Sequence, residues 1–437
     1  MSARETALNV LIACRKSAGW SNGVLKEYIS RDKLDRREAA LATRLCYGVM
    51  QNRLLLDFYL SQLLTGKLKS LHPMVRDILH LGLYQMFQMD RIPQSAAVNE
   101  AVGLAKKYCT KQKNAAGLVN AVLRNGARSI DTLKQPAGWE QIYSHPQKLI
   151  DRLLPYVGKN RMEAMLKANN EIPPTVVQVN TLRTTCEDLI AALEGEGVAA
   201  QAHPWLENCL TLSGTGSLEQ LESFQKGLFY VQDAAAKLSV LCAGLTPHQR
   251  VLDCCAAPGG KSFAAAMGMA GTGSIISCDV HSHKIPLLQR GAERLGIDNL
   301  KACEQDASMP VSQWVDAMDT VIADVPCSGY GIIRKKPDIR YKDPDTMLQL
   351  PQLQLAILKN QAGYVKPGGL LLYSTCTLIP EENEGVVERF LQERPDFCRE
   401  PLPLPSVFPE NTSGMLTLVP GEYDTDGFFI CRMRRME

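Results

Sequence analysis

Two cysteines stand where a buried strand gives way to a loop, at positions where a thiol could react rather than only pack. Cys327 lies in Thr320-Val-Ile-Ala-Asp-Val-Pro-Cys-Ser-Gly, and Cys376 lies in Gly369-Leu-Leu-Leu-Tyr-Ser-Thr-Cys-Thr. A buried cysteine usually behaves as a small apolar residue, and we assign that role to the other twelve of the 14 cysteines. Because both strands end at the same edge of a parallel sheet, Cys327 and Cys376 are expected to be functional thiols beside a bound cofactor.

A loop of small residues earlier in the chain is the expected cofactor site. It follows the buried strand Val251-Leu-Asp and consists of Cys255, Ala256, Ala257, Pro258, Gly259, Gly260 and Lys261. Glycine permits unusual dihedral angles and close approach of a ligand, and the first strand-to-helix turn of a doubly wound sheet binds adenosine cofactors. Neither a phosphate-binding P-loop nor the G-x-G-x-x-G fingerprint is present, which favours a cofactor without phosphate.

Three acidic residues end successive predicted strands on the same edge. Asp279 is placed to bind ribose hydroxyls, Asp306 to bind an adenine amine, and Asp324 follows on the next strand. A single aspartate at a strand end is usually a turn residue, but three in succession indicate a binding site. S-adenosylmethionine, which has ribose and adenine but no phosphate, matches best. No metal site is expected, because no two cysteines have C-x-x-C spacing.

The elements that must position these residues fall into three parts. Residues 1–140 have apolar residues at helical spacing almost throughout and predict an all-α domain, with a break at Gly19/Ser21. Residues 141–232 predict a helical linker (146–169) and a small β-α-β-α-β subdomain, with strands at 175–180, 201–212 and 228–232. Residues 233–437 predict a Rossmann-like α/β domain.

The α/β domain has the most regular pattern in the chain. Predicted strands alternate with helix-length segments, and two closely spaced strands end the chain; the seven are expected at 250–254, 273–278, 300–304, 320–323, 369–374, 415–419 and 427–433. A parallel sheet with helices on both faces follows, because parallel neighbours need crossover connections. The last two strands are expected to form a hairpin.

Charge and composition restrict the class of protein. The 437 residues carry a net charge of +2, but residues 1–140 contain 21 lysines and arginines against 11 acidic residues. A basic domain joined to a mildly acidic one favours binding of a polyanion by the first and small-molecule chemistry in the second. No signal peptide and no apolar run of membrane length are found, so we expect a cytoplasmic protein with free thiols and no membrane partner.

At this point four motifs together resemble those of the RNA cytosine-C5 methyltransferases. They are Ala256-Ala-Pro-Gly-Gly-Lys, Asp324-Val-Pro-Cys-Ser-Gly, Ser374-Thr-Cys-Thr and Asp426-Gly-Phe-Phe. The basic helical domain resembles the antitermination factor NusB. Over nearly its full length the chain is therefore similar to the Sun/Fmu type of bacterial small-subunit ribosomal RNA methyltransferases. Ser262 and Tyr341 depart from the residues usual in the family, threonine and tryptophan.

The resemblance implies a role for each motif. Cys376 would be the nucleophile, Cys327 the cysteine that assists release, and Asp324 the group that binds the base. Cys255 to Lys261, with Asp279, Asp306 and Asp324, would hold S-adenosylmethionine. The substrate would be 16S ribosomal RNA, and we expect a monomer. The basic run after Cys327 is placed to grip phosphates of the RNA; its cationic residues are Arg334, Lys335, Lys336 and Arg340.

Three alternatives stay open. The substrate could be transfer RNA, because the catalytic core resembles enzymes of both kinds. The chain could instead be a NusB-like RNA-binding or antitermination factor that lacks catalysis, although both cysteines and all three acids are present. Methylation of an exocyclic amine is disfavoured, because Cys327 stands where such sites carry an aromatic residue.

Overall fold

The structure, a computed structural model, describes residues 1–16 and 21–437. These residues form two compact units. The helical unit comprises Met1–Pro155, Lys159–Glu171 and Ile333–Pro344, and the α/β unit comprises Tyr156–Gly158, Ile172–Ile332 and Asp345–Glu437. The predicted order of an all-α part, a small mixed part and an α/β part is confirmed. Of the predicted break at Gly19/Ser21, Gly19 lies outside the described residues, while Ser21 begins a helix.

The described residues of the helical unit form seven α-helices before residue 130. They are α1 (Ala3–Lys16), α2 (Ser21–Arg31), α3 (Arg36–Gln51), α4 (Arg53–Leu63), α5 (Pro73–Gln88), α6 (Gln94–Tyr108) and α7 (Ala115–Ser129). The Asp35 side chain caps α3 by accepting a hydrogen bond from the Glu38 amide, and Pro73 starts α5, so local sequence fixes both helix starts.

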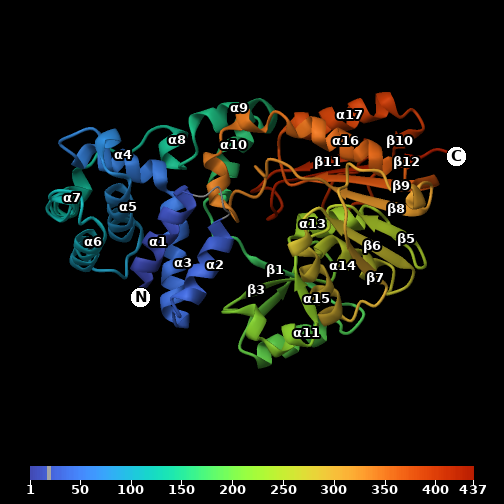
Figure 1. Ribbon diagram of the computed structural model, residues 1–437, viewed down its shortest axis with the longest axis horizontal. Coiled ribbons are helices and arrows are strands. Elements are labelled where there is room, and N and C mark those ends of the chain that lie inside the picture. Colours follow the sequence, from blue (N-terminus) through green and yellow to red (C-terminus); the bar gives the residue numbers. More distant parts are fainter. Residues whose placement is uncertain (17–20) are drawn as a thin grey trace. The chain divides into compact units, whose positions relative to one another are not determined.

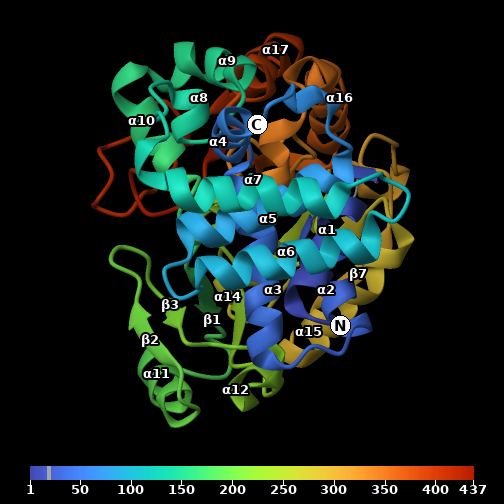
Figure 2. The same cartoon turned by 90° about the vertical axis from the view of Figure 1, so that its left-hand side faces the viewer.

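One apolar core joins these helices. It is built from residues at helical spacing on α1, α3 and α5, among them Leu8, Leu45 and Ile78, each without exposed surface. Figure 2 shows α5, α6 and α7 running side by side across the unit. The predicted helical linker is divided in the structure into α9 (Gln147–Val157) and α10 (Lys159–Ala168), and the short α8 (Trp139–Ile142) precedes them.

A segment distant in sequence completes the helical unit. Residues 333–344 follow Cys327 in the chain, yet they pack with α3 and form a short 3-10 helix, Pro337–Tyr341. The predicted domain boundaries at residues 140 and 232 remain predictions. The structure adds that 159–171 and 333–344 belong spatially to the helices.

The small subdomain of the α/β unit is a four-stranded antiparallel sheet of order β2-β3-β1-β4. Its strands are β1 (Thr175–Val179), β2 (Ala199–Ala202), β3 (Cys209–Ser213) and β4 (Phe229–Val231), with α11 (Cys186–Gly195) and α12 (Glu222–Gln225) between them. The prediction of one strand over 201–212 is wrong. Pro204 and the left-handed Asn208 turn the chain back into a hairpin.

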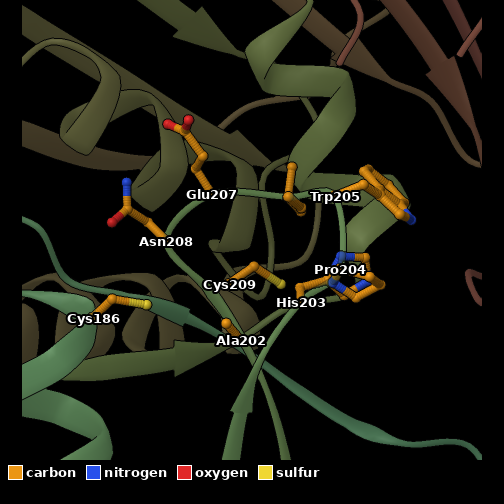
Figure 3. A pocket seen from close by; sticks show the side chains of 9 residues that line it. Cys186, Ala202, His203, Pro204, Trp205, Glu207, Asn208 and Cys209 are labelled. Atoms are coloured by element: carbon orange, nitrogen blue, oxygen red, sulfur yellow. The ribbon is translucent and has the colours of Figure 1, made fainter. Parts of the chain in front are cut away.

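The connecting loop of that hairpin is held by its aromatic residues. His203 and Trp205 meet edge to face with ring centroids 4.6 Å apart, and the Trp205 indole donates a hydrogen bond to the Tyr423 carbonyl. Figure 3 shows these side chains at the turn between the two strands. The subdomain is also fixed to the large sheet, because Asn180 Nδ2 donates to the Leu295 carbonyl.

The large sheet has the order β10-β12-β9-β8-β5-β6-β7, with β11 paired to β12. Its strands are β5 (Arg250–Asp253), β6 (Ser274–Asp279), β7 (Leu300–Glu304), β8 (Met318–Asp324), β9 (Val365–Thr375), β10 (Phe397–Arg399), β11 (Met415–Leu418) and β12 (Phe428–Arg435). Strands β5 to β9 pair in parallel and β12 joins β9 antiparallel. The predicted parallel sheet and final hairpin are confirmed, whereas β10 was not predicted.

Helices cover both faces of this sheet (Figure 1). Alternate residues of each strand point to opposite faces, so Ile322 packs with α13 (Ala234–Leu241), α14 (Gly260–Gly268) and α15 (Ile285–Leu295), whereas Val321 packs with α16 (Leu350–Ala362) and α17 (Glu384–Glu393). The chain order reverses between β5 and β8. The crevice outside their carboxyl ends is where such sheets bind ligands.

No helix within residues 1–16 and 21–437 is both long enough and apolar enough to cross a membrane.

Candidate active site

The carboxyl ends of β8 and β9 bring the two cysteines together. The strands pair in parallel with Asp324 opposite Ser374, and each cysteine follows in the loop that leaves its strand. The two Sγ atoms lie 3.2 Å apart, and both side chains are half-buried. The predicted placement of Cys327 and Cys376 at adjoining strand ends is therefore confirmed, and one thiol can donate a hydrogen bond to the other.

An ion pair lies at the same edge of the sheet. Lys261 Nζ, from the first turn of α14, is 2.6 Å from Asp324 Oδ2, and the Ser374 hydroxyl donates to Asp324 Oδ1 at 2.8 Å. Only 11% of the lysine side chain and 28% of the aspartate side chain are exposed. The ion pair thus links the loop that ends at Lys261 to β8, and Ser374 links it to β9.

Burial and neighbouring groups shift the pKa values of Lys261 and Cys327 in this cluster. Burial opposes the charge on Lys261, but the Asp324 carboxylate outweighs burial and raises the pKa of the ammonium group, with a further contribution from Cys376. The hydrogen bond to Cys376 raises the pKa of the Cys327 thiol well above its usual value, and burial acts in the same direction. Cys327 is therefore a neutral thiol.

A buried glutamate holds the loop that carries Cys327. Glu382 Oε2 accepts hydrogen bonds from the Ser328 amide and from Gln354 Nε2, each at 2.9 Å. Gln354 Nε2 also donates to the Pro326 carbonyl, so the residues on both sides of Cys327 are fixed. Burial raises the pKa of Glu382 above its usual value, and the hydrogen bonds from Ser328 and Gln354 offset only part of this rise.

Two glycines let three loops meet by their backbones. Gly331 donates to the Cys376 carbonyl and accepts from the Gly427 amide at 2.8 Å. A Cβ atom at Gly331 would lie 2.0 Å from the Gly427 carbonyl oxygen. A Cβ atom at Gly427 would in turn lie 2.7 Å from Gly331 Cα, which explains the glycine in the Asp426-Gly-Phe-Phe motif.

The cofactor loop has the backbone that was expected of it. Gly259 has a φ of +116° and caps α14. An added Cβ atom would lie 2.4 Å from the Phe263 ring, so only glycine fits there. Lys261 follows this turn and pairs with Asp324, so the ion pair links the loop to the end of β8.

Three aspartates at the ends of β5, β6 and β7 have carboxylate oxygens that can accept further hydrogen bonds. Asp253 at the end of β5 is fully buried; its Oδ2 accepts from Ser262, but its Oδ1 has no hydrogen-bond partner among the described residues. Asp279 and Asp306 accept local hydrogen bonds through Oδ1 from the amides of His281 and Ser308, respectively. These acceptors suit the ammonium, hydroxyl and amine donors of S-adenosylmethionine, so the residues fit that group.

The structure corrects two predicted RNA contacts, because Arg334 is buried with only 4% of its surface exposed and Arg340 is buried completely. Arg340 has no exposed surface, and its guanidinium donates to the carbonyl groups of Gln51, Ser144 and Asn169, all within the helical unit. A side chain that is fully buried and hydrogen-bonded in this way cannot grip a phosphate. Tyr341, which stands where the family usually has tryptophan, donates from its hydroxyl to the Met50 carbonyl at 2.7 Å.

Within the part of the chain that the structure describes, no group of three or more His, Cys, Asp or Glu side chains is arranged to hold a metal ion. His281 and His283 stack on each other with ring centroids 5.5 Å apart.

Comparison with known families supports each part of the chain separately. The sequence model for "16S rRNA methyltransferase RsmB/F" matches residues 241–434 and the NusB family model matches residues 1–128. A third, for the ferredoxin-like domain of RsmF/B-like methyltransferases, matches residues 145–219. The "Probable ribosomal RNA small subunit methyltransferase B" of Bacillus subtilis is 36% identical over 447 aligned residues, which cover 99% of each chain. The chain belongs to the RsmB/F family of methyltransferases. The predicted resemblance, including the NusB-like domain, is confirmed.

Other relatives agree with this assignment. The protein of the same name from Synechocystis is 34% identical over the whole of both chains. The solved structure of the protein PH0851 superimposes with a TM-score of 0.82 at 25% identity, covering 100% of this chain and 99% of the other. As a member of the family, the protein is an S-adenosylmethionine-dependent methyltransferase of ribosomal RNA.

Sequence reasoning missed two residues of this RsmB/F-family site. Asp253 was read only as part of a buried strand, although a charged residue at the end of an apolar run is itself a signal. Glu382 lies in a 3-10 turn without a motif of its own, and only the fold brings it to Ser328.

Proposed function

We propose that the protein methylates carbon 5 of a cytosine in 16S ribosomal RNA through a transient covalent bond between Cys376 Sγ and carbon 6 of the base. The observation that carries the proposal is the 3.2 Å approach of the Cys327 and Cys376 sulfurs beside the Lys261–Asp324 ion pair. Two thiols and a carboxylate at one sheet edge suit pyrimidine addition chemistry better than methylation of an amine.

The cofactor would lie against the loop from Cys255 to Lys261. Asp279 would accept from its ribose hydroxyls and Asp306 from its adenine amine. Asp324 would close the pocket, and Asp253 offers a buried acceptor for an ammonium group. When bound, S-adenosylmethionine supplies an electrophilic methyl group.

Cys376 would begin the reaction. Carbon 5 of cytosine is a weak nucleophile, and addition of a thiolate to carbon 6 moves electron density onto it. Lys261, paired with Asp324, holds a positive charge at this edge of the sheet. Asp324, whose carboxylate oxygens each keep a second lone pair, can accept from the amino group of the base and hold the ring in place.

Cys327 would assist release. After methylation, carbon 5 carries both a methyl group and a proton. Loss of that proton returns an electron pair to the ring, the double bond between carbons 5 and 6 reforms, and the Sγ–C6 bond breaks. In that step the neutral thiol of Cys327 would give its proton to the departing Cys376 sulfur while taking the proton from carbon 5, and the pair would then lose one proton to water, which restores the starting state.

The target base must leave its stack to reach the two sulfurs, which favours loops or single strands of RNA. Lys335 and Lys336, both partly exposed, are the proposed phosphate contacts. The NusB-like domain favours ribosomal RNA over transfer RNA. Bisulfite mapping of 5-methylcytosine in RNA from cells with and without the protein separates the two, because the unmethylated site appears in only one RNA population.

The decisive experiment replaces the proposed nucleophile. We expect Cys376→Ala to abolish methyl transfer to 16S RNA while calorimetry shows unchanged binding of S-adenosylmethionine. Cys398→Ala, at an exposed cysteine, is the matched control and should be fully active. Turnover by Cys376→Ala would overturn the mechanism. Failure of the wild-type protein to bind the cofactor would favour a non-catalytic RNA-binding role.

A further inference from the structure

A groove in the helical unit has cationic rims that the catalytic proposal does not use. It has a volume of about 840 Å³ and runs between the start of α1, one face of α3 and the connection from α5 to α6. Its four arginines are Arg4, Arg37, Arg44 and Arg91, and its two acidic residues are Asp35 and Glu38.

Three of the arginines are exposed and lack partners. Arg37 and Arg44 stand two turns apart on α3, so they project from one face of the helix, and Arg91 lies across the groove in the α5–α6 connection. No hydrogen bond or ion pair joins these three side chains to any residue within 1–16 and 21–437. Their charges are therefore available to a ligand.

The two acids, by contrast, serve the fold. Asp35 Oδ1 accepts from the Glu38 amide and caps α3, and Glu38 Oε2 accepts from the Ala3 amide at the start of α1. Arg4 is also engaged, because its Nε donates to Gln85 Oε1 at 2.7 Å. The unpartnered charge of the groove is thus positive.

Apolar side chains lie between the cationic residues. Leu41 stands on α3 between Arg37 and Arg44, and Met89 and Ile92 contribute from the opposite wall. A wall that alternates guanidinium groups with apolar surface suits unpaired nucleotides, whose phosphates pair with arginine and whose bases pack on apolar or guanidinium planes. An acidic peptide would use the charges but not the apolar surface.

We infer that this groove binds unpaired RNA, as a second contact with the substrate away from the reacting base. The inference rests on the proposed function only in taking RNA as the substrate. Arg37, Arg44 and Arg91 contact successive phosphates, and the surface around Leu41 and Ile92 receives bases. The groove adds affinity for the substrate RNA and does not take part in the chemistry.

The test uses the full-length protein and a fluorescent oligouridine, without S-adenosylmethionine. We expect the triple variant Arg37→Ala, Arg44→Ala, Arg91→Ala to bind the probe about tenfold more weakly. The dependence of log affinity on log salt should become shallower by about 2, because each phosphate contact with a single strand contributes about 0.7.

Two controls separate the groove from charge in general. The triple variant Lys113→Ala, Arg124→Ala, Arg128→Ala removes the same charge from residues that do not line the groove and should bind as the wild type does. The triple arginine-to-lysine variant at the groove should keep the salt dependence. Equal losses in both alanine triples, or oligoglutamate displacing the probe from the groove, would overturn the inference. Because binding is measured without methyl transfer, this result is independent of the Cys376 test.

Discussion

The hydroxyl groups of Ser328 and Thr377 share a hydrogen bond of 2.7 Å, and each of these buried residues directly follows one of the paired cysteines, Cys327 and Cys376. The bond links the loops after β8 and β9 at the point where their sulfurs meet. The separation of the sulfurs is thus set by a side-chain contact between the loops as well as by the sheet.

Removing this link should slow catalysis without changing substrate affinity. Ser328→Ala leaves the Thr377 hydroxyl without its partner and lets the loops shift, and a displacement of about 1 Å can cost a factor of about 100 in rate. We expect kcat to fall by about 10- to 100-fold with KM unchanged. Ser328→Thr, which keeps the hydroxyl, should restore most of the rate. A purely structural role would instead lower thermal stability and leave kcat per folded molecule unchanged.

Cys327→Ala should trap the enzyme on its substrate. Without the neutral thiol, proton loss from carbon 5 and departure of the Cys376 sulfur are slowed, so the covalent protein–RNA species accumulates. Denaturing gel electrophoresis with labelled RNA should show a retarded band that requires S-adenosylmethionine. The double variant Cys327→Ala, Cys376→Ala is the control and should give no band. A band in the double variant would place the covalent bond elsewhere.

The Lys261–Asp324 ion pair should contribute both to stability and to methyl transfer, and single and double variants can separate the two contributions. Each single change, Lys261→Met or Asp324→Asn, leaves the partner with an uncompensated charge and should lower the unfolding free energy by about 2 kcal/mol, a value reduced for their partial exposure. The double variant should regain most of that stability, because neither charge remains. Methyl transfer should stay at least about 100-fold reduced in all three variants. Activity that returned with stability would show that the pair only supports the fold.

The sequence predicted what depends on strands and their order. Apolar runs before Asp324 and Cys376 marked two buried strands, and the rule that parallel strands share one active edge placed their ends together. The Gly259 turn was recognisable because its backbone demands glycine. These features are local, or follow from general rules of topology.

What the sequence could not reveal depends on tertiary contacts. The run from Arg334 to Arg340 has the composition of an exposed basic loop, and charged residues are seldom fully buried. Only the packing of 333–344 against α3 turns Arg340 inward. Glu382 was missed for the same reason, because its partners Ser328 and Gln354 are far from it in the chain.

The buried Arg340 leads to a prediction about stability rather than RNA. Burial lowers the pKa of its guanidinium to about 10, so it remains charged at neutral pH. Arg340→Met would leave the carbonyl groups of Gln51, Ser144 and Asn169 without this donor, and each unsatisfied group costs about 1 kcal/mol or more. We expect the helical unit to lose about 3 kcal/mol, measured by hydrogen exchange of α3 amides. The exposed Arg128→Met should lose nothing. A change in the salt dependence of RNA binding by Arg340→Met, without loss of stability, would restore the predicted phosphate contact.

Asp253 should make the α/β unit less stable as pH rises. Burial raises the pKa of its carboxyl group to about 6, only partly offset by the hydrogen bond from Ser262. Below the unfolded value near 4, both states hold the proton and no cost arises. Between there and pH 6 the unfolded state releases a proton that the native state keeps, so unfolding becomes easier.

Asp253→Asn removes this titration. Relative to the wild type, the variant should gain about 2 kcal/mol in unfolding free energy between pH 4 and pH 7. Native-state hydrogen exchange of β5 amides, corrected for the intrinsic pH dependence, measures the unit directly, because a chain of several domains does not unfold in one step. Asp306→Asn, at an exposed carboxyl, is the control and should show no such gain. Parallel curves for Asp253→Asn and the wild type would mean that Asp253 stays ionised in the folded protein throughout this range, with a donor that supports its charge.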